Sequence, residues 1–295
     1  MKFAAIDIGS NAVRLLLTRV YENGNRPFFK KEALIRMPLR LGDDAFVRRR
    51  ISEAKAEMLV STLLGFKHLI DAYQPLAYLA CATSAMREVE NGAEIVQKIY
   101  ARSGIRLHII DGAEEAEMIY ANHFEERLEK DKSYLYVDVG GGSTELTFFS
   151  GGRSAASASF NIGTVRILEN LVPEERWREM KKWIKKSVVN RQKVYGIGSG
   201  GNINKLFELA RQKEGKPLSY KKLREIFQMV VAYSYEERIK ILDLKPDRAD
   251  VIVPALRIYL SVMKWGGISK IYVPQIGLAD GIIHVLYERY KRGEG

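Results

Sequence analysis

Cysteine and long hydrophobic runs are the two features that this sequence most clearly lacks. Cys81 is the only cysteine in 295 residues, so no intrachain disulfide can form, which is typical of a protein in a reducing cytoplasm. No apolar run is long enough to cross a bilayer, and the first residues do not have the pattern of a signal peptide. We therefore predict a cytoplasmic protein without a membrane partner.

Histidine is also scarce, and the sequence contains no low-complexity segment and no flexible linker. The four histidines share no metal-ligand spacing, so no histidine metal site is predicted; they are His68, His108, His123 and His284. Because 46% of the residues are apolar, the chain can bury a core and form one large domain or two of ordinary size.

Acidic residues are the minority charge. The chain has 36 Asp and Glu against 47 Lys and Arg, which gives a net charge of +11 and a pI near 9.5. Such a balance favours a polyanionic partner, which could be nucleic acid, an acidic membrane surface, or a phosphate-rich small molecule or polymer.

The richest stretch of the sequence is Tyr134–Glu145, in which an apolar strand ends in a carboxylate and three glycines. Gly140, Gly141 and Gly142 lack a Cβ, so their backbone N–H groups can approach an anion closely. A carboxylate beside such a loop suits a phosphate with a divalent cation. The alternative is a glycine-rich hairpin turn that follows an unrelated Asp138.

The same pattern occurs at the start of the chain, where an apolar strand ends at Asp7-Ile-Gly-Ser-Asn11. Each copy is followed by a strand, a tight turn and another strand. This duplication predicts two lobes that close on a phosphate between them. A third glycine loop, Val194–Asn202, also follows a short strand and begins a helix.

Two other strand ends carry polar residues. Thr83-Ser-Ala-Met-Arg87 follows a predicted parallel strand, at the position where α/β sheets bind ligands, and Arg87 could bind a phosphate with two hydrogen bonds. Glu114 and Glu115 follow the next strand. Acids are also favoured in the first turn of any helix, and Thr83 or Ser84 could simply cap one, so both patterns have an ordinary structural explanation.

Elsewhere the sequence predicts helices with less chemical content. We expect a helix from Asp111 to about Lys130, and a long helix over 248–265 with a kink at Pro254. The segment 37–50 is basic and has no clear periodicity. A helix over 173–188 has lysines on its polar face; we interpret that face as solvated, with contact to a polyanion as the second possibility.

Taken together, these motifs resemble the exopolyphosphatase and guanosine pentaphosphate phosphatase family, within the actin-like, sugar-kinase and Hsp70 superfamily. The resemblance spans nearly the whole chain, with the motifs in the family's order. They are Asp7-Ile-Gly-Ser-Asn11 with Arg14-Leu15, Ala82-Thr-Ser-Ala-x-Arg87, Gly112-x-Glu-Glu-Ala116, Asp138-x-Gly-Gly-Gly-Ser-Thr-Glu145, Gly163-x-Val-Arg166 and Arg248-Ala-Asp-Val251.

The resemblance implies an α/β fold with two ribonuclease-H-like lobes, mixed sheets and a cleft between the lobes. The lobes would span 1–130 and 131–280, with a C-terminal helix over about 281–295 packing back on the first lobe. It also implies hydrolysis of a terminal phosphoanhydride with a divalent cation, usually Mg²⁺. A homodimer is expected by family likeness only.

The family's functional residues fall on twelve positions of this chain. The catalytic glutamate corresponds to Glu115, and the acids that hold metal or water correspond to Asp138 and Glu145, with Asp7 as a further metal ligand. The phosphate-binding positions are Gly9, Ser10, Asn11, Arg87, Gly141, Gly142, Ser143 and Thr144. The chain departs from the family pattern at Ala12 and Asp111, where serine is usual.

The predicted function is release of terminal phosphate from inorganic polyphosphate, with guanosine pentaphosphate as a second substrate. The net charge favours a long phosphate chain over a single nucleotide, because a chain can engage many cations at once. The partner is therefore polyphosphate or another phosphate-rich substrate and not nucleic acid. The alternatives are an ATP-dependent kinase or ATPase of the same superfamily, and a non-catalytic sensor of alarmones or polyphosphate.

Overall fold

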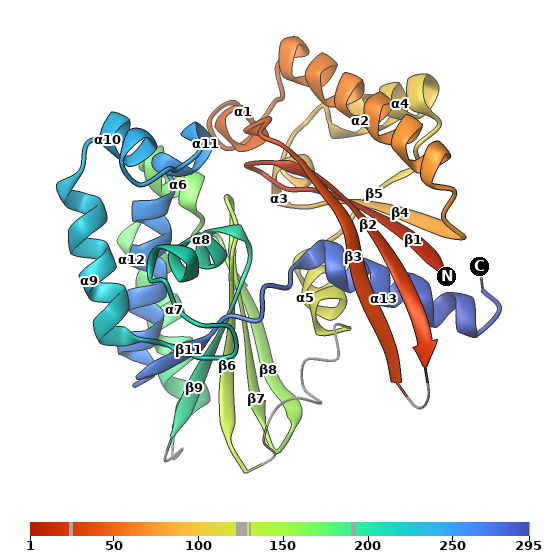
Figure 1. The fold of residues 1–295 in the computed structure, drawn as a ribbon. Helices are drawn as coiled ribbons and strands as arrows, with labels where there is room; N and C mark the ends of the chain where they lie inside the picture. Colours follow the sequence, from red (N-terminus) through yellow and green to blue (C-terminus); the bar gives the residue numbers. More distant parts are fainter. Residues whose placement is uncertain (24–25, 122–128, 130, 190–192, 295) are drawn as a thin grey trace. The chain divides into compact units, whose positions relative to one another are not determined.

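Two mixed β-sheets organise the chain, one in each of two units (Figure 1). In the computed structural model the described residues are 1–23, 26–121, 129, 131–189 and 193–294. Unit 1 comprises Met1–Asn122 together with Leu278–Gly295, and unit 2 comprises His123–Gly277. The chain therefore enters unit 2 and then returns to unit 1. No helix within the described ranges is both long and apolar enough to cross a membrane.

The sheet of unit 1 has the strand order β3-β2-β1-β4-β5. Its strands are β1 (Lys2–Ile8), β2 (Val13–Asn23), β3 (Arg26–Met37), β4 (Ala77–Ala82) and β5 (Leu107–Ile109). The first three form an antiparallel meander, and β4 and β5 add in parallel to β1. The parallel strand that the sequence predicted after Pro75 is confirmed, because β4 pairs with β1 from Phe3↔Ala77 to Ile8↔Ala82.

The sheet of unit 2 repeats this arrangement, in the order β10-β11-β9-β6-β7-β8. Its strands are β6 (Ser133–Val139), β7 (Thr144–Ser150), β8 (Arg153–Phe160), β9 (Val194–Ser199), β10 (Leu218–Ser219) and β11 (Lys270–Tyr272). The neighbours β8-β7-β6-β9-β11 match β3-β2-β1-β4-β5 one for one, so the duplication read from the two glycine loops is confirmed. The short β10 lies in a polar stretch for which the sequence predicted no strand.

The helices of unit 1 include one that arrives from the far end of the chain. They are α1 (Leu41–Arg48), α2 (Glu53–Tyr73), α3 (Ser84–Arg87), α4 (Gly92–Ser103), α5 (Gly112–Tyr120) and α13 (Leu278–Lys291). α13 packs against β1 and α5. At Gly281 its backbone is so close to α5 that a Cβ would lie 1.8 Å from the carbonyl oxygen of Met118. The expected continuation of α5 toward Lys130 falls mostly outside the described residues.

The helices of unit 2 pack around one apolar helix. They are α6 (Thr164–Leu168), α7 (Glu174–Val188), α8 (Gly201–Leu209), α9 (Tyr220–Ala232), α10 (Tyr235–Lys240), α11 (Pro246–Ala249) and α12 (Ile252–Trp265). α12 packs against β6, α7 and α9, with Leu256, Tyr259 and Val262 in the core. The single kinked helix predicted over 248–265 is wrong. Two helices form instead, and Pro254 lies in the first turn of α12, where its missing N–H breaks no hydrogen bond.

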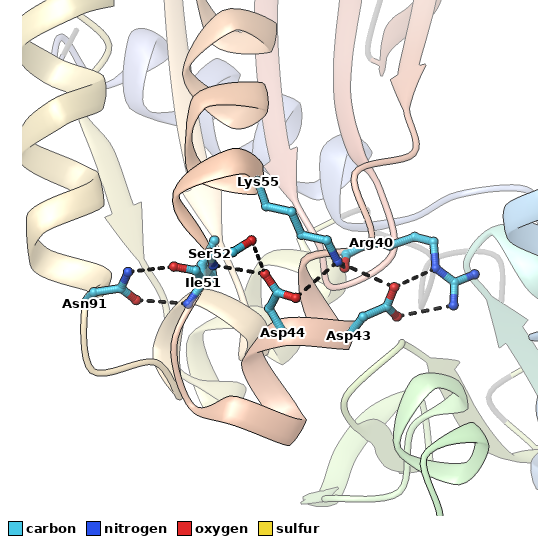
Figure 2. Close-up of polar contacts among 7 residues, drawn as sticks. All are labelled: Arg40, Asp43, Asp44, Ile51, Ser52, Lys55 and Asn91. Carbon is cyan, nitrogen blue, oxygen red and sulfur yellow. Dashed lines mark hydrogen bonds and ion pairs between the residues drawn. The ribbon is translucent and has the colours of Figure 1, made fainter.

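A network of polar contacts builds α1, which the sequence did not predict (Figure 2). The Asn91 side chain bonds both backbone groups of Ile51, at 3.1 and 2.9 Å. Asp44 Oδ2 accepts from Ser52 N at 2.9 Å and Ser52 Oγ at 2.5 Å, and Lys55 Nζ donates to the carbonyl of Arg40. Ser52 directly precedes α2, but its hydroxyl bonds Asp44 and makes no cap hydrogen bond.

Replacing Asp44 with asparagine is expected to destabilise the protein in a pH-dependent way. Burial alone would raise the pKa of Asp44, but the hydrogen bonds from Ser52 and the charge of Lys55 lower it below its usual value. A lowered pKa means that the stabilisation is present above the ordinary Asp pKa of about 3.9 and is lost as the pH falls through the folded-state value. Urea titrations should show a loss of about 1–3 kcal/mol at pH 7.

The same comparison should show a much smaller difference between the two proteins once the pH has fallen through the lowered folded-state pKa of Asp44, because the native carboxylate is then protonated. Asp71→Asn is the matched control, because Asp71 forms an exposed ion pair with Lys67 on α2, and such pairs contribute about 0–1 kcal/mol. Equal losses for the two variants, or a loss at Asp44 that is independent of pH, would contradict the role given to this network.

Candidate active site

The first glycine loop of unit 1 is a tight turn between β1 and β2. Gly9 N donates to the carbonyl of Ala12 at 3.1 Å, so Ala12 closes the turn through its backbone, and this bond needs no side-chain hydroxyl. Asp7 is buried near the end of β1, directly opposite Arg14 in the strand register, and the two side chains form an ion pair. The carboxylate of Asp7 therefore lies beside a cation at the foot of the loop.

The segment that leads into α1 holds this loop from one side. Gly42 N donates to the carbonyl of Ser10 at 2.8 Å, and Arg40 N donates to that of Asn11 at 3.0 Å. In a trans peptide the N–H points away from the preceding C=O, so the N–H groups of Asn11 and Ala12 point away from α1. The Ser10 and Ser84 hydroxyls are hydrogen bonded at 2.9 Å, which ties the loop to α3.

Arg87 is at the end of α3, as expected from its motif, and its guanidinium is anchored. Its Nη1 donates to the carbonyl of Ile110 at 2.6 Å. A guanidinium carries five N–H donors in a planar fork, so this bond orients the group and leaves other donors for an anion. Contact between Arg87 and phosphate remains a prediction.

Glu114 and Glu115, both in the first turn of α5, have different roles. Asp111 caps the helix, because its Oδ1 accepts from Ala113 N and Glu114 N at 2.8 Å each. Glu114 completes a capping box by accepting from Asp111 N at 2.9 Å. The departure from the family's serine at Asp111 is thus one cap residue in place of another. Glu114 has a local structural task, whereas Glu115 is half-buried one position further along.

The surroundings of Cys81 indicate that Asp7, Glu114 and Glu115 lie near one another at one edge of the sheet in unit 1. Cys81 lies opposite Asp7 in the register of β1 and β4. Burial raises the pKa of its thiol to about 12, and the negative charges of Asp7, Glu114 and Glu115 add to this effect. We expect Cys81 of the native protein to resist alkylation by iodoacetamide at pH 8, and Cys81 of the urea-unfolded protein to react fully. Rapid labelling of the native protein would contradict a buried thiol with a raised pKa.

In unit 2, Asp138 and Glu145 come together on one face of the sheet. They are directly opposite each other in the antiparallel register of β6 and β7, so their side chains project from the same side. Ser199 Oγ donates to Asp138 at 3.4 Å, and Ser159 Oγ donates to Glu145 at 3.0 Å. The two carboxylates that the sequence predicted as partners are therefore neighbours.

Gly140–Ser143 forms the turn between these strands, closed by Gly140 N donating to the carbonyl of Ser143 at 2.9 Å. Residues at the start of α6 donate hydrogen bonds to three carbonyl groups of this turn. Thr164 N donates to the carbonyl of Gly140 at 3.0 Å, Val165 N to that of Gly141 at 2.9 Å, and Arg166 Nε to that of Gly142 at 2.8 Å. Because the peptides are trans, the N–H groups of Gly141, Gly142 and Ser143 all point away from α6. Three successive amides with this orientation form a site for an anion.

Residues outside the predicted set build this loop. A Cβ on Gly163 would lie 2.2 Å from the carbonyl oxygen of Gly141, so only glycine lets α6 approach. The hydroxyl of Thr144, a predicted phosphate ligand, donates to the carbonyl of Ile162 at 2.5 Å and so has a structural role in this loop. Gly163 and Arg166 belong to a motif already visible in the sequence, but their contact with the glycine loop could not be inferred from it.

The third glycine loop adjoins Asp138 from the other side. Gly200 has a φ of +91° and a Cβ there would lie 2.8 Å from Asp138 Oδ1, so glycine is required twice over. The guanidinium of Arg248 lies against Gly201, and its Nη1 donates to Asn202 Oδ1 at 3.4 Å. Tyr259 stays protonated because burial and the charge of Asp138 raise its pKa, and it donates to the carbonyl of Ser199 at 2.8 Å.

The carboxylates of unit 2 fit a magnesium ion by their chemistry. Mg²⁺ prefers oxygen ligands and is usually bound by one or two carboxylates together with substrate phosphates. Asp138 and Glu145 supply two such groups beside the amides of the glycine loop. No cluster of three His, Cys, Asp or Glu suited to a metal occurs among the described residues. Asp7, the third predicted ligand, lies in unit 1 in its ion pair with Arg14.

The predicted residues therefore form two groups, one in each unit. Asp7, Gly9, Ser10, Asn11, Arg87 and Glu115 belong to unit 1, and Asp138, Gly141, Gly142, Ser143, Thr144 and Glu145 belong to unit 2. In each group a carboxylate lies at the end of a strand, and a tight turn follows it. The carbonyls of that turn accept hydrogen bonds from the segment that follows the third strand of the unit. This part of the duplication, α1 in one unit and α6 in the other, was not apparent from the sequence.

A model of the Ppx/GppA phosphatase family matches residues 33–289. Among curated proteins, a bifunctional 3-dehydroquinate synthase/phosphatase of Fusobacterium nucleatum is 26% identical over 92% of this chain and 44% of that protein. The chain thus spans less than half the length of this relative.

Solved structures give the same picture of the fold. The Ppx/GppA enzyme of Aquifex aeolicus is 26% identical, with a TM-score of 0.75 over 97% of this chain and 99% of that one. An exopolyphosphatase of Cytophaga hutchinsonii has a TM-score of 0.83 over 98% of both chains, at 24% identity, and shows likeness of fold. The expected mixed α/β architecture with two sheets is confirmed.

Proposed function

The chain belongs to the Ppx/GppA phosphatase family, and from this premise we propose that it releases the terminal phosphate of inorganic polyphosphate. Guanosine pentaphosphate is the second candidate substrate. One observation carries the proposal. Three successive amides, of Gly141, Gly142 and Ser143, are turned outward by α6, next to the paired carboxylates Asp138 and Glu145. This set offers hydrogen-bond donors to phosphate oxygens and oxygen ligands to a cation.

In the proposed reaction a water molecule attacks the terminal phosphorus and Glu115 accepts its proton. The bond from that phosphorus to the bridging oxygen breaks, and the electron pair leaves with the shortened chain. The amides of the glycine loop and the guanidinium of Arg87 offset the charge on the phosphate oxygens. Most of the acceleration in phosphoryl transfer comes from such positioning and electrostatics.

Asp138 and Glu145 would hold Mg²⁺, with Asp7 as a further predicted ligand. The bound ion would supply positive charge that offsets the charge of the transferring phosphate. Ser199 and Ser159, which donate to the two carboxylates, orient these ligands. We expect chelation of divalent cations to abolish phosphate release and Mg²⁺ to restore it.

The net charge of +11 favours polyphosphate over a nucleotide. A long chain can engage many cations, whereas a single nucleotide needs few, and such binding should weaken as salt rises. We therefore expect polyphosphate to be the preferred substrate and guanosine pentaphosphate the second.

The test compares three substrates in parallel, with Mg²⁺ and with a chelator. They are long-chain polyphosphate, guanosine pentaphosphate and ATP. Metal-dependent release from either of the first two supports the proposal and ranks the substrates. Release from ATP alone would indicate the kinase or ATPase alternative. Tight binding of all three without release would indicate a sensor.

A further inference from the structure

The positive charge of this protein is concentrated in one unit. Residues 123–277 contain 27 Lys and Arg against 18 Asp and Glu, which gives +9 of the total +11. Unit 1 is nearly balanced, with 20 basic and 18 acidic residues. Many cations of unit 1 are paired with acids; Lys98, for example, lies between Glu53 and Glu57. The unbalanced charge therefore belongs to unit 2.

The densest group of these cations lies on α7. We call it the α7 basic face; it consists of Arg178, Lys181, Lys182, Lys185 and Lys186. All five side chains are exposed, and within the described part of the chain none of them has an ion pair or hydrogen bond. An ion pair on α7 joins Arg176 to Glu179, outside this group.

Helix geometry places the five cations side by side. At about 100° per residue they fall within an arc of about 140°, over a length of roughly 12 Å. The opposite side of α7 is apolar, with Met180 and Ile184 buried and with Trp177 and Trp183 packed on Trp265 and Phe160. Three like-charge pairs spaced i,i+4 are thus held on one surface, which disfavours the free helix. The helix dipole offsets this only in the last turn.

α7 is separate from the glycine loops. It packs against α12 and against β8, the edge strand of the sheet, and supplies none of the residues of the candidate active site. We therefore expect a substrate with three phosphates bound at the glycine loop to leave α7 unoccupied. A long chain has many more phosphates.

We propose that the α7 basic face binds the body of the polyphosphate chain, as an accessory site outside the catalytic residues; this rests on the proposed function. Four of its five cations are lysines, whose ammonium groups bind phosphates as point charges without bidentate geometry. No aromatic side chain is exposed on this face for base stacking, because Trp177 and Trp183 are turned inward. Val189, which follows α7 directly, is exposed, but a single valine gives these cations little apolar surface to enter a bilayer. These features favour a flexible polyanion without nucleobases.

The test reverses two charges without weakening the helix. In the variant Lys181→Glu with Lys182→Glu, two repulsive i,i+4 pairs become attractive pairs with Glu on the N-terminal side, so the thermal midpoint should not fall. The matched control is Lys221→Glu with Arg224→Glu on α9, which makes the same charge change at exposed, unpaired positions of the same unit. Both double variants are measured with and without Glu115→Gln, which prevents turnover during binding.

Binding of long-chain polyphosphate is measured by fluorescence anisotropy over a range of salt. The α7 variant should lose roughly 10- to 100-fold in affinity at low salt. Its slope of log K against log salt should fall by about two, one for each lost cation. KM for long chains should rise in proportion, while kcat and KM for tripolyphosphate stay unchanged. The α9 control should bind long chains almost as the wild type does.

Unchanged long-chain affinity in the α7 variant, or an equal loss in the α9 control, would overturn the proposal. So would a variant that loses binding only to a single-stranded oligonucleotide or to anionic vesicles, tested in the same assay. If the wild type releases no phosphate from polyphosphate of any length, the proposed function fails, and the binding comparison still decides whether α7 holds the chain.

Discussion

Replacing Glu115 with glutamine is expected to reduce phosphate release by about 10²–10⁴-fold, the range for loss of a general base. Glutamine has nearly the same shape but cannot accept a proton from the attacking water. The change should fall on kcat, with KM and the thermal midpoint close to those of the wild type, because Glu115 is not needed to cap α5. Steady-state release from polyphosphate under saturating Mg²⁺ measures this directly.

The adjacent glutamate provides a matched control. Glu114 accepts a hydrogen bond from Asp111 N in the capping box, and glutamine can accept the same bond. Glu114→Gln therefore makes the same chemical change one residue away and should keep most of the activity. If both variants lose activity equally, the loss comes from the altered charge in the first turn of α5. Near-normal turnover in Glu115→Gln would exclude Glu115 as the base.

The second large effect is expected from adding one methyl group at Gly163. Its Cβ would lie 2.2 Å from the carbonyl oxygen of Gly141 and 2.4 Å from the carbonyl carbons of Gly141 and Gly142. These are backbone atoms, so either α6 or the glycine loop must shift. A shift of about 1 Å in a group that positions a substrate can cost roughly 10²-fold. We expect kcat/KM of Gly163→Ala to fall by at least that factor.

Gly65 serves as the control for this substitution. It lies inside α2, and a Cβ there would meet no atom within 4 Å, so Gly65→Ala should stabilise the helix by about 0.5–1 kcal/mol. Gly163→Ala should in contrast lower both the thermal midpoint and the activity. A Gly163→Ala protein with wild-type kinetics would mean that the position of the glycine loop does not limit the reaction.

Much of the candidate site could be predicted because its residues lie at strand ends. The family resemblance pairs Asp138 with Glu145, and the structure places them opposite each other across a four-residue turn, so both project from the same face of the sheet. The repeated acidic glycine motif likewise predicted the repeated meander of each sheet. These inferences depend on local geometry, which a sequence carries.

The rest depended on contacts between distant residues. α1 is short and lies in a basic stretch, and its surroundings are held by Asn91 and Lys55, which lie 40 and 15 positions from the groups that they bind. The outward turn of the glycine loop's amides depends on α6, about 23 residues downstream. Pro254 was read as a kink because the start of α12 could not be located. In each case a tertiary contact, and not propensity, decided the local structure.

The return of α13 to unit 1 has a consequence for how the protein is made. Domains usually fold in the order in which they leave the ribosome, N-terminal first. Here the strands of unit 1 emerge first, but α5 rests on the backbone of Gly281, which is translated only after all of unit 2. The nascent chain therefore carries Glu115 on an unsupported helix until α13 has been translated. The proposed release of phosphate should arise only after that point, when the proposed polyanion-binding surface of unit 2 has already formed.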